Sequence, residues 1–292
     1  MVTFMLGADP EVFVTKKGQA ISAHGLIEGT KRSPQRTSLG GAQVDGTALE
    51  FNIDPVEASN FEKFNLNVVR TLKDLKELAK DVNFSKVSVQ DFDPEYLKSL
   101  PEEALELGCD PDFNAYTGQK NPTPDGTRSF RTGAGHVHIG WGADIPVSNE
   151  EHVEICRGFI KMLDATVGAF MTYIDREPRR RELYGKAGAF RPKPYGAEYR
   201  TPSNAWIWNR SRRTVMHAMI NYAISRHTGG YEPRQIAGLA DEQAVVDMIN
   251  SGNHVIAQQV VYRCLPHMNE ARRCFDDIVA EFEKADKKEV AA

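Results

Sequence analysis

The sequence lacks the features that mark a secreted or membrane protein. Its 292 residues include four cysteines with no CxxC pair among them, so reduced thiols are expected instead of a disulfide framework. No apolar run approaches the roughly 20 residues that span a bilayer. The start, MVTFMLGADPEVF, has no basic stretch and reaches an acid at Asp9, so no signal peptide is expected. These absences predict a cytoplasmic protein without a membrane partner.

Glycine-rich nucleotide motifs are also missing. The sequence contains neither a Walker lysine loop nor a GxGxxG turn, so any use of ATP requires a different architecture. Strands and helices are mixed without regular βα alternation, which favours an α+β fold with a mainly antiparallel sheet. The formal net charge of −4 leaves no overall basic field, and nucleic acid is not expected as a direct partner.

Apolar periodicity predicts where the regular elements lie. Two-residue alternation or short apolar runs between turn residues predict strands at 2–6 with 12–15, 20–23, 48–53, 87–90, 137–141 and 197–201. Helical spacing predicts one helix near 61–79 and another that Asn149 caps and that ends near Ile174. Residues 29–41 and 109–135 are rich in turn formers and are predicted to be mostly loop.

The chain is predicted to form one domain over residues 1–292, since this length suffices for a single large core. The motifs lie in a core at 1–208, and a helical part follows at 209–285. The last residues, 286–292, are expected to fray.

The segment from Arg181 to Asn204, RELYGKAGAFRPKPYGAEYRTPSN, carries the most distinctive chemistry. It places five cations around Glu198, namely Arg181, Lys186, Arg191, Lys193 and Arg200. Arginine gives bidentate contacts to phosphate oxygens, lysine gives a point charge, and the carboxylate suits a divalent ion that bridges those phosphates. Lys186 and Arg191 are expected in a loop bounded by glycine and proline that wraps a polyphosphate.

A second interpretation of this segment is an exposed basic loop that contacts solvent or nucleic acid. Its interleaved aromatic residues resemble base-stacking residues: Tyr184, Phe190, Tyr195 and Tyr199. The embedded Glu198 and the acidic net charge argue against this interpretation.

Three acids lie in strand-like sequence elsewhere. Asp9 and Glu11 are two residues apart, so both carboxylates face one side if Pro10 does not break the strand. Adjacent acids repel unless a cation lies between them, although an Asp-Pro turn with two solvated acids explains the pattern equally well. Glu50 alternates with apolar neighbours and is predicted on a polar sheet face, either functional or merely solvated. Asp45, before Gly46, is most simply a turn residue.

His136 and His138 lie on one face of a predicted strand, GHVHIG. One imidazole can bind a metal and the other a phosphate, or both can make structural hydrogen bonds. An oxygen-rich set of acids with one or two histidines favours Mg²⁺ or Mn²⁺ over zinc, which prefers histidine and cysteine. Lys31 lies in a lesser basic loop, solvated or in contact with phosphate. Asp110 and Asp112 belong to a polar turn or contact an amine.

The ordered motifs GxDPE, DGxxxEFN, GxHVHIG and YGxxGxFRxKxxGxEYRTPSN resemble the carboxylate–amine ligases of glutamine synthetase fold, and most of all the phage-type COOH·NH2 ligases related to glutamate–cysteine ligase. The resemblance spans roughly Leu6 to Asn204. It implies a curved, mainly antiparallel sheet with helices packed on one face and two or three Mg²⁺ or Mn²⁺ ions on the polar face. It also implies ATP entering from one side and an amine from the other.

The resemblance implies roles for individual residues. The implied metal ligands are Glu11, Glu50, His136, Glu198 and Asp9. ATP contacts are expected from His138, Arg181, Lys186, Arg191 and Lys31. Arg191 and Arg200 are expected to neutralise the transferring phosphoryl group, and Glu50 is a candidate acceptor for the amine proton.

The predicted function is therefore an ATP-dependent ligase that joins a small-molecule or peptide carboxylate to an amine, in the host cytoplasm if a phage encodes it. A metal-dependent hydrolase and a non-catalytic nucleotide- or nucleic-acid-binding module are the alternatives. The two substrates and the oligomeric state stay open.

Overall fold

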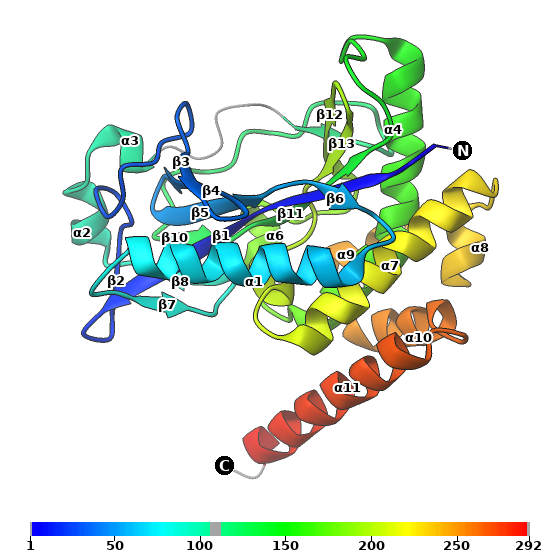
Figure 1. The fold of residues 1–292 in the computed structure, drawn as a ribbon. Coiled ribbons are helices and arrows are strands. Elements are labelled where there is room, and N and C mark those ends of the chain that lie inside the picture. Colours follow the sequence, from blue (N-terminus) through cyan, green and yellow to red (C-terminus); the bar gives the residue numbers. More distant parts are fainter. Residues whose placement is uncertain (1, 106–111, 291–292) are drawn as a thin grey trace.

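The computed structural model describes residues 2–105 and 112–290, which fold around one large antiparallel sheet (Figure 1). Its main strand order is β3-β4-β5-β1-β11-β13-β12-β9, with β2, β6 and β7 pairing with β1 off this path. The strands are β1 (Met5–Lys16), β2 (Gln19–Ile21), β3 (Gln35–Thr37), β4 (Gly40–Asp45), β5 (Ala48–Ile53), β6 (Val56–Glu57), β7 (Asn83–Ser85), β9 (Phe113–Asn114), β11 (Gly135–Gly140), β12 (Ala189–Lys193) and β13 (Gly196–Tyr199). A separate two-stranded sheet pairs β8 (Val89–Asp91) with β10 (Phe130–Thr132).

The helices are α1 (Phe61–Leu78), α2 (Pro94–Lys98), α3 (Glu102–Leu105), α4 (Glu150–Leu163), α5 (Ala169–Ile174), α6 (Arg180–Leu183), α7 (Arg210–Thr228), α8 (Pro233–Ala237), α9 (Glu242–Asn250), α10 (His254–Cys264) and α11 (Asn269–Val290). The longer ones pack on one face of the large sheet, where α1 contacts β4 and β5, and α4 contacts β12 and β13. The apolar residues between these layers form the main core, so the predicted α+β class is confirmed. Helix α2 lies elsewhere and packs in a smaller apolar cluster with Phe13 and Ala48.

Strand alternation separates an apolar face from a polar face. Leu6, Ile139 and Ala197 oppose one another across β1, β11 and β13 and are buried under the helices. Their neighbours in sequence therefore point to the other face of the sheet. The polar face is where the predicted acids and histidines lie.

The first strand differs from the prediction of two pieces around ADPE. Strand β1 runs through Pro10, which opposes Gly135 at the end of the ladder with β11. A proline lacks only its own N–H, and the next donor, the Glu11 N–H, bonds the carbonyl of Ala134 at 2.8 Å. The strand therefore continues, and Asp9 and Glu11 share a face.

Two segments predicted as loops form strands. Residues 29–41 contain β3 and the start of β4, where the backbone approaches β5 closely: a Cβ added at Gly40 would lie 1.9 Å from the carbonyl oxygen of Asn52. Strand β12 replaces the loop expected around Arg191, and Pro192 is tolerated because β9 pairs only with Ala189 and Phe190. The other predicted strands lie within two residues of their expected positions.

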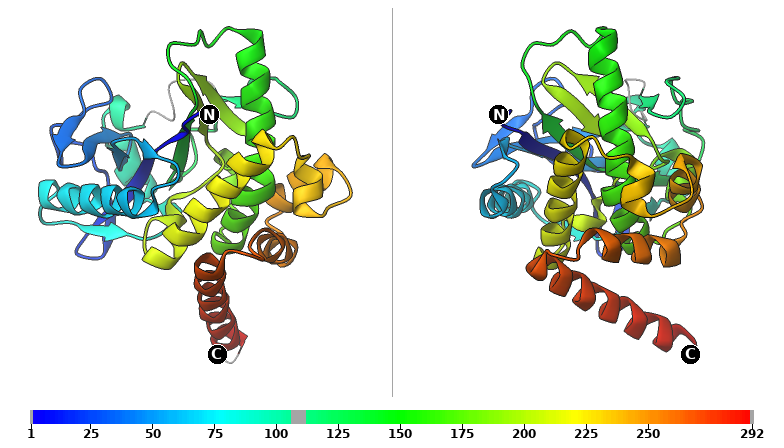
Figure 2. Two further views of the ribbon diagram at one scale, coloured as in Figure 1. Left: turned by 45° about the vertical axis from the view of Figure 1, so that its right-hand side comes forward. Right: turned by 90° about the vertical axis from the view of Figure 1, so that its right-hand side faces the viewer.

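The helical predictions also need two corrections. Asn149 caps α4 as predicted, but a π-helical turn at Asp164–Gly168 interrupts the path to Ile174. Helix α11 continues to Val290, through residues that were expected to fray from residue 286 (Figure 2). Near its end, Arg176 and Asp286 form an ion pair at 2.9 Å. No helix among the described residues combines the length and apolar character needed to cross a bilayer.

Candidate active site

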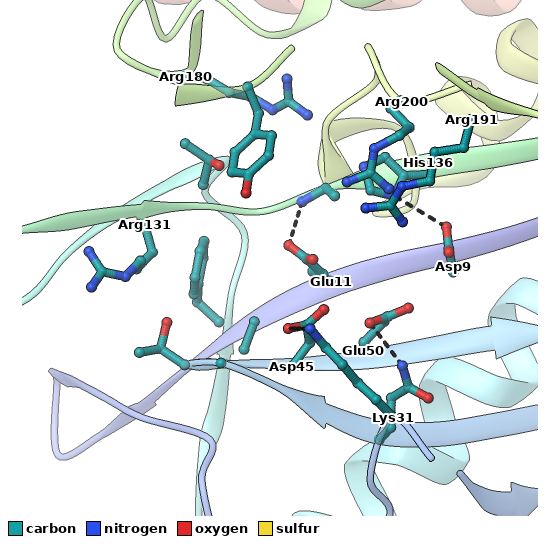
Figure 3. A pocket seen from close by; sticks show the side chains of 18 of the residues that line it. Asp9, Glu11, Lys31, Asp45, Glu50, Arg131, His136, Arg180, Arg191 and Arg200 are labelled. Carbon is teal, nitrogen blue, oxygen red and sulfur yellow. Dashed lines mark hydrogen bonds and ion pairs between the residues drawn. The ribbon is translucent and has the colours of Figure 1, made fainter. Parts of the chain in front are cut away.

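Five neighbouring strands bring the predicted acids and histidines together on the polar face. The register pairs Glu11 with Glu50 across β1 and β5, and Asp9 with His136 across β1 and β11. It also pairs Glu198 with His138 on β11 and with Arg191 on β12. Figure 3 shows Asp9, Glu11, Glu50, His136 and Arg191 around a cavity of about 350 Å³.

The first group of potential ligands is Glu11, Asp45 and Glu50, whose carboxylate oxygens lie within 4.8 Å of one another. Glu11 accepts the Ala134 N–H at 2.8 Å, and Glu50 accepts the Gln43 amide at 3.0 Å. Burial, followed by the charge of Asp45, raises the pKa of Glu11 to about 7. Burial and the charge of Asp9 raise the pKa of Glu50 well above its usual range. Three converging acids, of which Glu11 and Glu50 resist ionisation, fit a divalent cation, which would offset their repulsion.

The second group is Asp9, His136 and Glu198. The His136 Nδ1 lies 3.5 Å from an oxygen of Asp9 and 3.6 Å from an oxygen of Glu198. That buried Asp9 oxygen, Oδ1, accepts no hydrogen bond from the described residues. Burial and then the charge of Arg200 lower the pKa of His136, which keeps its imidazole neutral and able to ligate. Two carboxylates, one neutral imidazole and an orphaned oxygen fit Mg²⁺ or Mn²⁺.

Three cations surround Glu198 on the other side. Its carboxylate contacts Arg200 directly, Lys193 at 2.7 Å and Arg191 at 3.6 Å. Only 1% of Glu198 is exposed, and burial alone would raise its pKa. The charges of Arg200, His138 and His136 together outweigh burial and lower the pKa to about 2. Glu198 is therefore ionised at neutral pH. It lies where the metal ligands meet the cations.

The strand that carries Glu198 is anchored from behind. Asp164, fully buried in the π-helical turn, accepts hydrogen bonds from the Tyr199 hydroxyl and the Gly188 N–H, both at 2.6 Å. Tyr199 lies between Glu198 and Arg200 in sequence and points to the opposite face. The π turn thus fixes β13, and with it the two side chains that face the cavity.

Two further chambers adjoin the main cavity. One, of about 910 Å³, is lined by apolar and aromatic groups such as Trp141 and Tyr195 together with His138, and it shares Asp9 and Glu50 with the main cavity. We call it the apolar chamber. The other, of about 490 Å³, is the loop chamber: Asp112 and Lys186 line it, and Tyr184 and Arg200 belong to both it and the main cavity.

The structure brings most of the predicted residues to one place. The main cavity is lined by Asp9, Glu11, Lys31, Glu50, His136, Arg191 and Arg200. Glu198 lies beside Asp9 and His136 as the third potential ligand of their group. His138 faces the apolar chamber, its Nε2 lying 3.0 Å from Asp9. Lys186 lies in the loop chamber, and Asp110 lies outside the described residues.

Arg181 is the predicted ATP contact that the structure places elsewhere. It lines a small internal cavity instead, and its guanidinium approaches the backbone carbonyls of Asp175 and Glu177 at 3.5 Å. Helical geometry explains the difference, since Arg180 and Arg181 point about 100° apart on α6 and only one can face the site. The idea of a base-stacking surface also loses two members, because Phe190 and Tyr199 are buried under the helices.

Sequence reasoning favoured a turn role for Asp45 over a ligand role, and it gave Arg131, Arg180 and Tyr184 no role in a ligase site. The sequence did contain a signal that Asp45 shares a face with Glu50. A hairpin turning at Gly46-Thr47 pairs Asp45 with Ala48 and Gln43 with Glu50, which puts Asp45 on the face of Glu50. The two arginines come from segments without strand periodicity, so only the tertiary structure brings them to the cavity.

Comparison with known proteins finds a family model that matches part of the chain. Residues 126–244 match the model of the family described as phage phiEco32-like COOH.NH2 ligase-type 2. This match supports the predicted resemblance to the carboxylate–amine ligases and the predicted enzyme class, a carbon–nitrogen ligase. The matched segment contains His136, Arg191 and Glu198, whereas Glu11 and Glu50 precede it.

No curated protein matches the sequence of this chain. Among solved structures, one described as "GmaS/ADP complex-Conformation 1" aligns over 99% of this chain and 70% of its own, with 12% identity and a TM-score of 0.49. Another, described as "Crystal structure of novel glutamine synthase homolog", aligns over 94% of this chain and 70% of its own, with 10% identity and a TM-score of 0.41. Both structures share little sequence identity with this chain, and both TM-scores lie below 0.5.

Proposed function

We propose that the protein is an ATP-dependent carboxylate–amine ligase that makes an amide through an acyl phosphate. The observation that carries the proposal is Glu198, a buried ionised carboxylate shared between a metal-ligand group and three cations. A site that transfers a phosphoryl group needs both, because the ion and the cations must offset charge on the same phosphate oxygens.

The residues fit two divalent ions, Mg²⁺ or Mn²⁺. Glu11, Asp45 and Glu50 would hold one, and Asp9, His136 and Glu198 the other. Such ions, when bound, withdraw charge from phosphate oxygens and orient them.

We place ATP with its base in the apolar chamber, beside Trp141 and Tyr195, and its phosphates at the acid row. His138 lies at that junction, and its imidazole would contact a phosphate. Burial would lower the pKa of His138, but the charge and hydrogen bond of Asp9, together with the charge of Glu198, outweigh burial and raise the pKa, which favours the protonated imidazole that binds an anion. Lys31, paired with Asp45 at 2.6 Å, would contact the phosphates from the far side of the cavity.

The reaction has two steps in this proposal. An oxygen of the substrate carboxylate attacks the γ-phosphorus, the bond to the bridging oxygen breaks, and ADP leaves. The amine then attacks the acyl carbon, and phosphate departs with the carboxylate oxygen. Arg191 and Arg200 stabilise the charge on the transferring group. The amine, entering by the loop chamber, loses a proton to an ionised carboxylate of the row, for which we propose Glu50.

The fate of the carboxylate oxygen tests this mechanism. An acid labelled with ¹⁸O in its carboxylate should transfer one label to inorganic phosphate for each amide formed, measured by mass spectrometry with ATP and Mg²⁺. Label in AMP would show an acyl adenylate and contradict the proposal. Activity without ATP would instead support a metal-dependent hydrolase, in which the three cations around Glu198 have no task.

A further inference from the structure

Both ring nitrogens of His138 have partners within the chain. The Nε2 atom lies 3.0 Å from Oδ2 of Asp9, and the Nδ1 atom lies 2.5 Å from the hydroxyl oxygen of Tyr195. The imidazole and the phenol ring are tilted by 44°, with their centroids 6.1 Å apart. The proposed function places a phosphate at this imidazole. One of the two partners must therefore leave its nitrogen when a phosphate binds there.

The two partners of His138 are not equally easy to displace. Asp9 offers a carboxylate, and a hydrogen bond to an ionised group is roughly twice as strong as one between neutral groups. Asp9 also belongs to the second group of potential metal ligands, which a cation would hold in place. Tyr195 offers only a neutral hydroxyl, on a residue that is 38% exposed. A phosphate oxygen is therefore expected to replace the hydroxyl and not the carboxylate.

The backbone of Tyr195 is fixed, so only its side chain is free to move. Its carbonyl oxygen accepts the N–H of Trp141 at 2.8 Å, which ties the turn between β12 and β13 to the end of β11. The next residue, Gly196, packs directly on β11, where an added Cβ would lie 2.0 Å from the carbonyl oxygen of Ile139. A rotation about χ1 suffices to move the hydroxyl away from His138.

The hydrogen bond between Tyr195 and His138 lies where the proposed nucleotide changes from base to phosphate. Both residues line the apolar chamber, as does Trp141. Asp9, on the other side of the imidazole, lines the apolar chamber and the main cavity. A nucleoside in the apolar chamber can leave this bond intact. A ligand with phosphates at the acid row cannot use His138 without breaking it.

We infer that Tyr195 is a gate on the phosphate position: its hydroxyl occupies the nitrogen of His138 that a phosphate oxygen takes, and the two compete. The inference rests on the proposed placement of ATP and deepens it. The exchange replaces a bond to a neutral hydroxyl by a charge-assisted bond to phosphate, so it favours the ligand. The bond that is given up still lowers the affinity for ADP, which favours release of this product. Adenosine, without a phosphate, is outside the competition.

Removal of the hydroxyl tests the gate by binding alone. Isothermal titration with Mg²⁺ would compare ADP, pyrophosphate and adenosine on the parent protein and on Tyr195→Phe. Phenylalanine keeps a ring in the apolar chamber but cannot occupy His138. ADP and pyrophosphate should therefore bind about threefold to tenfold more tightly to the variant, the range that one neutral hydrogen bond covers. Adenosine should bind within about twofold of the parent.

Two further variants separate the gate from a general effect on the chamber. In a His138→Ala background the bond no longer exists, so adding Tyr195→Phe should change the affinity for ADP by less than about twofold. The matched control is Tyr231→Phe. Tyr231 is 48% exposed and packs under the Arg226 guanidinium, 5.0 Å from the ring centroid. This control should keep the parent affinity for all three ligands.

Weaker ADP binding by Tyr195→Phe would show that the hydroxyl contacts the nucleotide, and it would overturn the gate. Unchanged ADP and pyrophosphate binding, an equal gain in the His138→Ala background, or no binding of either ligand to any variant would overturn it too.

The proposed function fails separately from the gate. Pyrophosphate that binds more tightly to Tyr195→Phe, on a protein that binds neither ADP nor ATP, keeps the gate and removes the ATP-dependent ligase. ADP release that needs both an acid and an amine, on a protein whose ADP affinity ignores Tyr195→Phe, keeps the ligase and removes the gate.

Discussion

Glu198→Gln should abolish ATP turnover, with a fall in kcat on the order of 10³-fold, while the protein stays folded. Glutamine has nearly the same shape as glutamate but lacks the negative charge that lies between the metal-ligand group and the three cations. Arg191, Lys193 and Arg200 would then repel one another and any cation held by Asp9 and His136. The fold should survive because Arg200 keeps Asp112 and because Lys193 is 29% exposed at its side chain.

Steady-state ADP release measures the loss, and circular dichroism with a thermal melt checks the fold. Glu62→Gln provides the matched control, since Glu62 is an exposed acid paired with Arg210 on the surface. It should keep turnover within about twofold, as surface substitutions usually do little. Turnover by Glu198→Gln within about tenfold of the parent would show that Glu198 is not central to the chemistry.

The second large effect concerns pH and metal. In the folded, metal-free protein the pKa of Glu11 is raised to about 7 and that of Glu50 is raised well above its ordinary value, so both carboxyls resist ionisation. Their contribution to the free energy of unfolding is complete below their ordinary pKa and is lost as pH rises through about 7. Stability without metal should therefore fall as the pH rises from about 4.5 to about 7.

Divalent ions should reverse this loss because ligands must be deprotonated to bind them. At saturating Mg²⁺ or Mn²⁺ the Tm should rise by about 5 °C at pH 8 and much less at pH 6, measured by scanning calorimetry against EDTA. Asp164, whose pKa is also raised to about 7, lies away from both ligand groups, so its titration cannot produce a metal-dependent difference. The variant Glu11→Gln should reduce both the loss of stability with rising pH and the rise in Tm caused by the metal. An equal rise in Tm with metal at pH 6 and at pH 8 would contradict the account.

Much of the site follows from strand alternation alone. The spacing of Asp9 and Glu11, of His136 and His138, and of Glu198 and Arg200 predicts a shared face for each pair, and β1, β11 and β13 deliver it. Glu50 follows from its apolar neighbours in the same way. These predictions hold because a two-residue period is local and does not depend on which strands become neighbours.

The remainder depends on tertiary structure. Register between distant strands decides that Asp45 meets Glu11, and helix rotation decides that Arg180 faces the cavity and Arg181 does not. The strand status of β12 depends on the pairing with β13, which overrides the turn tendency of Pro192.

The central claim is that this cavity couples ATP to the joining of an acid and an amine. Its most direct measurement is ADP release by the purified protein with Mg²⁺, with acid and amine added singly and together from cell extract fractions or defined panels. The account predicts ADP and phosphate in equal amounts only when both are present, with a product lighter than its two parents by one water. AMP as the product, or ADP release that is the same with the acid alone as with both substrates, would contradict it.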